Sequence, residues 1–422
     1  MSLTPCDLLL RRCRWQDEEV DIAIGDGRIT AIAPNLTETA QLELDAGGKL
    51  VSPPFVESHI HLDSALTPGE PRWNQSGTLD EGLEIWGELR QSLSLEDVKK
   101  RAIETLKLQA SQGVLFVRTH ADVSEASLMA LLGLLEVREL VKDWITLEVV
   151  AFPQDGVYGN PQHEELLEEA LKLGADAVGG LPDYELTRED GVKSVHRIFE
   201  LAEKYDRLID IHCDESGDEQ SRFLEVVAAC AVRSGMGSKV TASHAVSLGH
   251  YNNAYVQKLM GFLVRSQINF VANPFSSITM QGRTSTYPKP RGVTRVKELW
   301  QAGLNVSLGT DAIQDSCYSL GTGNMLDVAH MALHICHMTG MSEIDACFDM
   351  VTTHGAKTLH LENNYGIEVG KPANLIVLDA DSRYDAIRRR ATVTHVISQG
   401  KLLVRTEPPV TKWNFDLLVS VD

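Results

Sequence analysis

The chain has 422 residues, of which 43% are hydrophobic and 23% are charged, and this composition excludes a largely disordered protein. Its 39 Lys and Arg residues against 59 Asp and Glu residues give a formal net charge of −20, so nucleic acid and anionic membranes are not expected partners. The seven cysteines form no C-x-x-C pair, and no apolar stretch approaches the roughly 18 residues of a membrane span, so we expect a cytoplasmic protein without a signal peptide.

The first part of the chain, up to residue 51, alternates in short strand-like pieces. The pieces DLLLRRC and VDIAIGDGRITAIA are punctuated by turn signals such as Gly25-Asp26-Gly27, and no long helical pattern interrupts them. The segment from Gly366 onward has the same character, with GIEVGKPANLIVLD, VTHVISQG and KLLV. Neither segment alone has enough strands to bury a core, so we expect the two to pair into one small β-sandwich.

Between these ends, short apolar and β-branched runs alternate with helical patterns such as those at 95–112 and 163–173. There are eight such runs, at residues 50–61, 114–122, 145–154, 175–182, 208–215, 240–244, 268–274 and 304–311. Eight β-α units predict a closed parallel (β/α)8 barrel. An open, doubly wound sheet would normally have fewer strands and a Gly-rich phosphate loop after the first, where this chain has His-Ile-His. We therefore expect a barrel over residues 53–362, and a β-sandwich built from residues 1–52 and 363–422.

Chemically active side chains stand at the C-terminal ends of four of these runs, where a barrel carries its active site. The first run ends in His59-Ile60-His61, and both imidazoles share one face because alternate residues of a strand point the same way. Other runs end in His212-Cys213-Asp214-Glu215, in Ser243-His244 and in Thr310-Asp311. Three imidazoles and a carboxylate suit Zn²⁺ or Fe²⁺, with a water molecule completing the shell. The sequence therefore predicts a metal centre at the barrel mouth.

These strand ends belong to longer motifs, PPFVESHIHLD at 53–63, HCDE at 212–215, SHA at 243–245 and GTDA at 309–312. With these motifs the chain resembles the amidohydrolase superfamily and, within it, the bacterial cytosine deaminases. The likeness extends over nearly the whole chain and includes WNQSGTL at 73–79, VRTHADVS at 117–124 and VVAFPQDG at 149–156. The resemblance implies a metal-dependent hydrolase whose substrate is a small nucleobase. We expect it to convert cytosine or 5-methylcytosine to uracil or thymine plus ammonia.

The resemblance also implies a role for individual residues. The implied metal ligands are His59, His61, His212 and Asp311. Many binuclear relatives bridge two ions through a carboxylated Lys or a Glu on the fourth strand. Residues 173–191 contain no Lys, and 176–182 supply no obvious substitute, so we expect one divalent ion, zinc or iron.

Glu215, His244 and Asp311 are the expected catalytic residues, and hydrolytic deamination defines what they would do. A metal lowers the pKa of a bound water toward ~7, which makes hydroxide available. Glu215 would protonate a ring nitrogen and pass a proton to the departing amine. His244 would hold the attacking hydroxide, and Asp311 would accept its proton. Gln154, the implied substrate-binding residue, offers a donor and an acceptor to the carbonyl and N–H edge of a pyrimidine.

Two positions on the substrate side of the last strand depart from the cytosine deaminase pattern. Ala312 stands where those enzymes have a second Asp, and Cys317 stands where they have a Trp. We interpret both as substrate-binding positions that make the pocket larger and less polar. An apolar 5-methyl group would then fit, so 5-methylcytosine is the first candidate. The alternatives are isoguanine or another bulkier amino-heterocycle, and an alkylaminotriazine of the ammelide type.

Other functions fit the residues less well. Cyclic amide hydrolysis of the dihydroorotase or hydantoinase kind generally uses two metals and the bridging Lys that is absent here. A non-catalytic metal-binding scaffold would not need Glu215 and His244. Asp63 could orient a metal-bound imidazole, and His120 could either donate a hydrogen bond behind the ligands or be structural. We also expect the chain to form a homo-oligomer.

Overall fold

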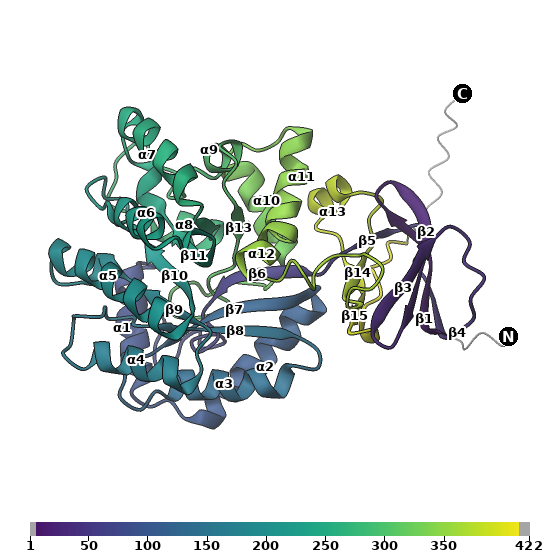
Figure 1. Ribbon diagram of the computed structural model, residues 1–422, viewed down its shortest axis with the longest axis horizontal. Coiled ribbons are helices and arrows are strands. Elements are labelled where there is room, and N and C mark those ends of the chain that lie inside the picture. Colours follow the sequence, from purple (N-terminus) through teal and green to yellow (C-terminus); the bar gives the residue numbers. More distant parts are fainter. Residues whose placement is uncertain (1–5, 413–422) are drawn as a thin grey trace.

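The computed structural model describes residues 6–412 and divides them between a barrel and a smaller sheet, which Figure 1 shows side by side. The barrel sheet has eight parallel strands in the order β13-β12-β11-β10-β9-β8-β7-β6. They are β6 (Phe55–Ile60), β7 (Val114–Asp122), β8 (Thr146–Phe152), β9 (Ala177–Gly180), β10 (Leu208–Cys213), β11 (Val240–His244), β12 (Asn269–Ala272) and β13 (Val306–Leu308). All nine residues of β7 are buried, as expected where helices cover the outside and side chains fill the inside. The predicted (β/α)8 barrel is confirmed.

Helices connect the strands and cover the outside of the barrel (Figure 1). Several begin where the sequence supplies a cap: the side chains of Thr78, Ser94 and Thr187 each accept a hydrogen bond from the backbone N–H three residues on. The helices are α1 (Leu79–Arg90), α2 (Leu95–Ser111), α3 (Met129–Val141), α4 (His163–Leu173), α5 (Arg188–Tyr205), α6 (Phe223–Ser234), α7 (Asn253–Ser266), α8 (Pro274–Met280), α9 (Val296–Gln301), α10 (Met325–Ile335), α11 (Met341–Met350), α12 (Thr353–Thr358) and α13 (Arg383–Arg389). Short 3-10 turns are η1 (Pro182–Tyr184), η2 (Gly237–Lys239) and η3 (Val246–Gly249).

The small domain is a mixed sheet that both ends of the chain build together. Its strands run in the order β16-β15-β14-β5-β1-β2-β3, and β4 pairs with β1 off this path. They are β1 (Cys6–Trp15), β2 (Glu18–Gly25), β3 (Arg28–Ala33), β4 (Ala40–Asp45), β5 (Leu50–Ser52), β14 (Leu375–Leu378), β15 (Val393–Ser398) and β16 (Lys401–Arg405). The antiparallel pair β14–β5 joins the two chain ends, and the sheet has a core of its own. The expected pairing of the end segments is confirmed, whereas the domain bounds stay a prediction.

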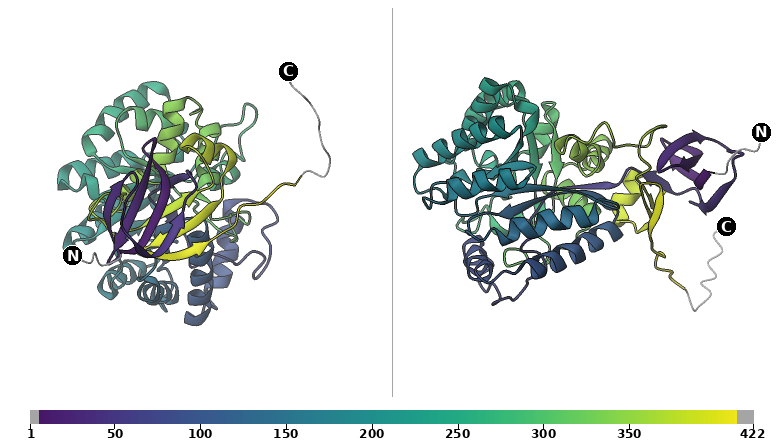
Figure 2. Two further views of the ribbon diagram at one scale, coloured as in Figure 1. Left: turned by 90° about the vertical axis from the view of Figure 1, so that its right-hand side faces the viewer. Right: turned by 60° about the horizontal axis from the view of Figure 1, so that its bottom comes forward.

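The small sheet lies at the N-terminal ends of the barrel strands. Strand β5 leads into β6 after only two residues, and Gly113, just before β7, packs against Ile376 and Val393 of the small sheet. Figure 2 shows the small sheet projecting from one end of the barrel. The C-terminal ends of the barrel strands are therefore free of it. Within residues 6–412 we find no helix with the length and apolar character that a membrane crossing requires.

The barrel closes between its first and last strands at a short seam. Only one isolated parallel bridge, Ile60 with Asp311, is formed there, and the Asp311 N–H donates to the carbonyl of His59 at 2.9 Å. The buried carboxylate of Glu57 reinforces this junction, because it accepts hydrogen bonds from the backbone N–H of Thr310 at 2.9 Å and from its hydroxyl at 2.6 Å. A residue expected to bind metal thus also closes the barrel.

A buried arginine occupies the interior of the barrel below the mouth. Arg118 of β7 forms ion pairs with Glu148 at 2.9 Å and with Asp210 at 3.0 Å, and it donates to the carbonyl of Thr358 at 3.0 Å. Burial raises the pKa of Glu148 to about 7 despite the neighbouring guanidinium. Because an unpaired charge in the interior is costly, these groups can be buried only together.

Replacing Arg118 tests this dependence. We expect Arg118→Met to lower the free energy of unfolding by about 3 kcal/mol, because Glu148 and Asp210 lose the positive charge between them. Urea unfolding in the presence of a chelator measures the change without a contribution from metal binding. The control is Lys107→Met, which removes an exposed ion pair with Glu104 and should leave the stability nearly unchanged. Equal losses in the two variants would contradict the expectation.

Candidate active site

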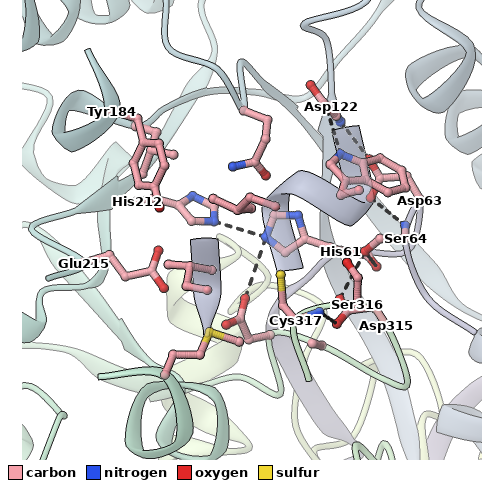
Figure 3. A pocket seen from close by; sticks show the side chains of 18 residues that line it. His61, Asp63, Ser64, Asp122, Tyr184, His212, Glu215, Asp315, Ser316 and Cys317 are labelled. Carbon is pink, nitrogen blue, oxygen red and sulfur yellow. Dashed lines mark hydrogen bonds and ion pairs between the residues drawn. The ribbon is translucent and has the colours of Figure 1, made fainter. Parts of the chain in front are cut away.

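A pocket opens at the C-terminal ends of the barrel strands, away from the small sheet. Its lining includes seven of the nine predicted site residues, namely His61, Gln154, His212, Glu215, Asp311, Ala312 and Cys317. The other two, His59 and His244, are buried next to it, with His59 5.5 Å from His61 and His244 4.9 Å from His212 between ring centroids. Figure 3 shows the imidazoles of His61 and His212 next to each other, joined by a dashed line, with Glu215 on the side of His212. The structure therefore brings the predicted residues to one place.

Imidazoles and one carboxylate converge at the base of this pocket. The Nε2 atoms of His61 and His212 are 3.1 Å apart. Asp311 Oδ1 lies 3.3 Å from His59 Nε2 and 3.7 Å from His61 Nε2. Two sets of side chains have ligand atoms within 4.8 Å of one another and could hold an ion: His59, His212, His244 and Asp311, and His59, His61 and His120. Each of the four predicted ligands belongs to at least one set.

The chemistry of these donors fits a divalent metal. His59 Nε2 and His212 Nδ1 are buried and have no hydrogen-bond partner among the described residues. Burial, together with the neighbouring His120, lowers the pKa of His59 to about 4, so its imidazole is neutral at pH 7. Burial likewise lowers the pKa of His212 well below its ordinary value. Neutral imidazoles and an ionised carboxylate are the donor types that Zn²⁺ and Fe²⁺ bind.

A hydrogen-bonded chain behind the pocket orients His59. The hydroxyl of Ser243 lies 2.9 Å from His59 Nδ1 and donates to Asp210 Oδ1 at 2.6 Å. This contact leaves Nε2 of His59 directed at Asp311, as expected for an imidazole that binds metal through one nitrogen and a supporting group through the other. His120 lies in the same layer, fully buried, with Nε2 3.5 Å from Asp210. Ser243 and Asp210 were missed in the sequence, although Ser243 stands inside the motif SHA.

Asp63 links the loop after β6 to the end of β7. Its carboxylate accepts hydrogen bonds from the backbone N–H groups of Ser64 at 2.9 Å and of Asp122 at 2.8 Å. Among the described residues no imidazole hydrogen-bonds to it. Burial raises the pKa of Asp63 to about 6. Of the two roles left open for Asp63, the hydrogen bonds of the structure favour the structural one, because both of its oxygens accept from backbone N–H groups.

Glu215 and His244 form the expected pair beside the imidazoles. Glu215 Oε1 lies 3.4 Å from His244 Nδ1, and its backbone N–H donates to Asp183 at 3.1 Å. Burial, followed by the negative charges of Asp311 and Asp183, raises the pKa of Glu215 well above its ordinary value. Burial lowers the pKa of His244 to about 3. The raised pKa favours the protonated form of Glu215, which is the form that a general acid needs, and His244 is neutral at pH 7.

The backbone at two of these strand ends is unusual. His244 has a φ of 66° and Asp311 has a φ of 68°, values that residues other than glycine seldom adopt. His244 is the last residue of β11, and Asp311 stands three residues after β13, so both unusual conformations lie where barrel strands end. Such conformations cost about 1–3 kcal/mol each and cluster at functional sites.

The substrate side of the pocket contains residues that sequence reasoning missed. Helix α1 contributes Trp86, and η1 contributes Tyr184. Asp315, four residues beyond Asp311, is also buried in the lining, and its Oδ1 accepts hydrogen bonds from the N–H groups of Cys317 at 2.8 Å and Tyr318 at 2.7 Å. Burial raises the pKa of Asp315 to about 6. Only the position of Asp315 after a barrel strand could have indicated it in the sequence.

The chain belongs to the amidohydrolase family, whose sequence profile matches residues 42–404. This family is metal-dependent, and the His and Asp residues of the pocket supply a group that could hold an ion. The chain is accordingly a hydrolase acting on carbon–nitrogen bonds other than peptide bonds. The resemblance drawn from the motifs is confirmed.

Three proteins similar to this chain are named for the substrates on which they act. The structure of 5-methylcytosine deaminase from Klebsiella pneumoniae liganded with 5-fluorocytosine is 47% identical, has a TM-score of 0.93, and covers 96% of this chain and 99% of that chain. N-isopropylammelide isopropyl amidohydrolase from Pseudomonas sp. strain ADP is 32% identical over 409 residues, which is 95% of this chain and 98% of that protein. Pterin deaminase from Rhizobium rhizogenes is 29% identical over 395 residues, covering 92% of this chain and 89% of that protein.

The role of Ser243 can be tested through metal affinity. We expect Ser243→Ala to weaken metal binding by about 10- to 100-fold, because His59 loses the group that orients its ring. Competition with a coloured chelator measures the dissociation constant. Ser276→Ala is the matched control, since the buried hydroxyl of Ser276 has no hydrogen-bond partner within residues 6–412. An unchanged affinity in Ser243→Ala would show that other contacts orient His59.

Proposed function

We propose that this protein hydrolyses the exocyclic amine of a cytosine-type pyrimidine, with 5-methylcytosine as its preferred substrate and thymine and ammonia as products. The observation that carries this proposal is a pocket lined by Glu215, by the imidazole and carboxylate groups that could hold an ion, and by Ala312. Alanine leaves space for a methyl group where a carboxylate would require hydration. The 47% identity to a 5-methylcytosine deaminase supports the same class of substrate.

We propose that one ion occupies the site, held by His59, His61, His212 and Asp311. A second ion would need a bridging ligand from the fourth barrel strand. That strand, β9, consists of Ala177, Val178, Gly179 and Gly180, which have no metal-binding side chain. Asp176, just before it, is occupied by Arg138 at 2.8 Å and by the N–H of Val149 at 2.9 Å. Imidazole and carboxylate donors favour zinc or iron.

When bound, such an ion lowers the pKa of a water molecule toward ~7 and so supplies a nucleophile at neutral pH. Glu215 then donates its proton to the ring nitrogen beside the amine, which makes the neighbouring carbon electrophilic. His244 hydrogen-bonds to the attacking oxygen and keeps it on one face of the ring. Asp311 is ionised, because the surrounding imidazoles hold its pKa far below the ordinary value despite burial, and it accepts the proton of the attacking water. Glu215, ionised by that transfer, would then take up the proton of the hydroxyl formed on the ring carbon and pass it to the departing amine, which leaves as ammonia. Return of the proton held by Asp311 would restore the acid form of Glu215.

Gln154 supports the orientation of the ring. It lies in the pocket lining two residues after β8, and its amide can pair with the carbonyl and N–H edge of the pyrimidine at the same time. Cys317 lines the pocket close to Ala312, and burial raises the pKa of its thiol well above the ordinary value, so it is an uncharged neighbour. Ala312 and Cys317 therefore leave the pocket wall apolar around the 5-position of the pyrimidine ring.

An alkylaminotriazine is the second candidate substrate. The apolar side chains of Leu79, Leu83 and Met280 line the same pocket and would suit an N-alkyl group. The 32% identity to an N-isopropylammelide amidohydrolase supports this alternative. Both reactions displace an amine from an aromatic ring and use the same acid and metal-binding group.

Measuring product release distinguishes these substrates. The enzyme, reconstituted with Zn²⁺ or Fe²⁺, is given cytosine, 5-methylcytosine, isoguanine, isocytosine, aminotriazines or N-isopropylammelide, and ammonia or isopropylamine is quantified. We expect the highest kcat/KM for 5-methylcytosine. A preference for N-isopropylammelide would establish the second candidate instead. Metal analysis giving two tightly held ions per chain would contradict the single-ion proposal.

The role of Glu215 can be tested by removing its proton. We expect Glu215→Gln to retain its metal and to lose at least ~10²-fold in kcat, the low end for deleting a general acid. Turnover and metal content are measured on the same preparation. Glu219→Gln, on an exposed carboxyl of the same loop, is the control and should behave like the wild type. Turnover of Glu215→Gln within a few-fold of the wild type would assign the proton transfer to another group.

Ala312 should select between cytosine and 5-methylcytosine. One additional methyl group in a fitted pocket contributes about tenfold in kcat/KM, so we expect the wild type to favour 5-methylcytosine by about that factor. Ala312→Asp should reverse the preference, because the carboxylate has to stay hydrated. Ala312→Asn, of the same size but uncharged, separates the effect of charge from that of volume. An unchanged ratio in Ala312→Asp would show that this position does not select the substrate.

A further inference from the structure

Helix α1 forms part of the pocket wall. Its side chains Leu79, Leu83 and Trp86 are in the lining, and the helix belongs to the long connection between β6 and β7. A helix on such a connection must be held by specific contacts if it is to keep a constant position over a substrate.

The N-terminal half of α1 lies against the loop that follows β13. The hydroxyl of Ser316 donates to the carbonyl of Gly82 at 2.9 Å. The approach is so close that a Cβ on Gly82 would lie 2.8 Å from the sulfur of Cys317. This half of the helix therefore has a direct packing contact with the pocket wall.

The C-terminal half is held by charge. The guanidinium of Arg90, the last residue of α1, pairs with Asp122 at 2.9 Å, with Glu125 at 3.2 Å and with Asp155. Its side chain is only 12% exposed, and that of Asp122 is 5% exposed. Trp86, one turn earlier, donates its indole N–H to the same Asp122 oxygen at 2.8 Å. Arg90 is thus a nearly buried cation among three carboxylates from two other loops.

These loops connect Arg90 to the substrate-binding side of the pocket. Asp122 ends β7, and Asp155 directly follows Gln154 in a tight turn in which the N–H of Gly156 donates to the carbonyl of Pro153 at 3.0 Å. Arg90 donates to both oxygens of Asp155. A planar guanidinium engaged in this way fixes orientation as well as distance, which a lysine ammonium cannot do.

We propose that Arg90 is a positioning residue that holds helix α1 and the Gln154 loop in one arrangement over the substrate. It does so without being in the pocket lining. Without Arg90, Asp122 is left as a buried and unpaired carboxylate, so water enters and the helix separates from the two loops. The inference that this governs substrate affinity rests on the proposed deaminase function. The contacts that connect α1 to the Gln154 loop are independent of that function.

The test compares variants of Arg90, the last residue of α1, with a variant of Arg72, which contacts α1 from outside the helix. Arg90→Met removes the contacts of the guanidinium with the two loops. Arg90→Lys keeps the positive charge but loses the planar guanidinium that binds both oxygens of Asp155. Arg72→Met is the matched control, because Arg72 pairs with three carboxylates of the helix itself, Glu81, Glu84 and Glu88, at 3.0, 3.1 and 3.0 Å. Asp155→Asn removes a half-exposed partner of Arg90 and serves if Arg90→Met does not fold. The readouts are kcat and KM for 5-methylcytosine, and amide hydrogen exchange of the metal-loaded enzyme without substrate.

We expect Arg90→Met to raise KM by about tenfold or more while kcat stays within about threefold. This pattern arises when a variant binds the substrate and the transition state more weakly by the same amount. Exchange should become faster at residues 79–90 and 153–157 and stay unchanged in the barrel strands. Arg90→Lys should lie between this variant and the wild type, and Arg72→Met should match the wild type. An unchanged KM, a loss confined to kcat, or the same changes in Arg72→Met would overturn the proposal. If the wild type deaminates none of the substrates, the proposed function fails, and the exchange of Arg90→Met alone decides whether the link exists.

Discussion

A buried pairing of Arg118 with Asp210 underlies both the barrel and its site. Asp210 accepts hydrogen bonds from Arg118 and from Ser243, and Ser243 contacts Nδ1 of His59. Because the guanidinium compensates its charge, Asp210 can stay ionised in the interior and hold the Ser243 hydroxyl in one direction. That direction decides which nitrogen of His59 faces Asp311. The packing of the barrel interior and the orientation of a metal-binding imidazole therefore form one network.

The periodicity of the sequence predicted most of the fold, since β7, β11 and α4 have the predicted bounds. The run at 50–61 was expected as one strand but contains two, β5 in the small sheet and β6 in the barrel. Pro53 and Pro54 separate them, because proline has no N–H for a strand ladder. The run at 145–154 was too long because its apolar character continues past Phe152 to Pro153, which lies in the loop beside the pocket. Periodicity detects burial, and residues lining a pocket are buried as strand residues are.

The site was predictable where its chemistry lies at strand ends. Spacing placed His59 and His61 on one face of a strand, and parallel topology brought them to His212, His244 and Asp311. The supporting contacts were not predictable, because they join strands and loops that are far apart in sequence. Asp63 is an example: the sequence left open whether this carboxylate, two residues from His61, orients an imidazole, and in the structure it accepts from backbone N–H groups. The sequence identifies a candidate hydrogen-bond acceptor, but only the fold shows which donors lie within hydrogen-bond distance of it.

The short seam between the first and last barrel strands has a consequence for biosynthesis. Asp311 supplies both the bridge that closes the barrel and the carboxylate of the metal-binding group, and it is the last of these residues to leave the ribosome. A nascent chain of about 300 residues already holds every histidine of the group, but it lacks the acid and has two open sheet edges. Closure of the barrel and completion of the His and Asp group therefore both require the same residue, Asp311. A chain truncated before Asp311 would have an open barrel, which is exposed to proteolysis, and an incomplete His and Asp group. Degradation of open barrels would therefore also remove the chains that lack the complete site.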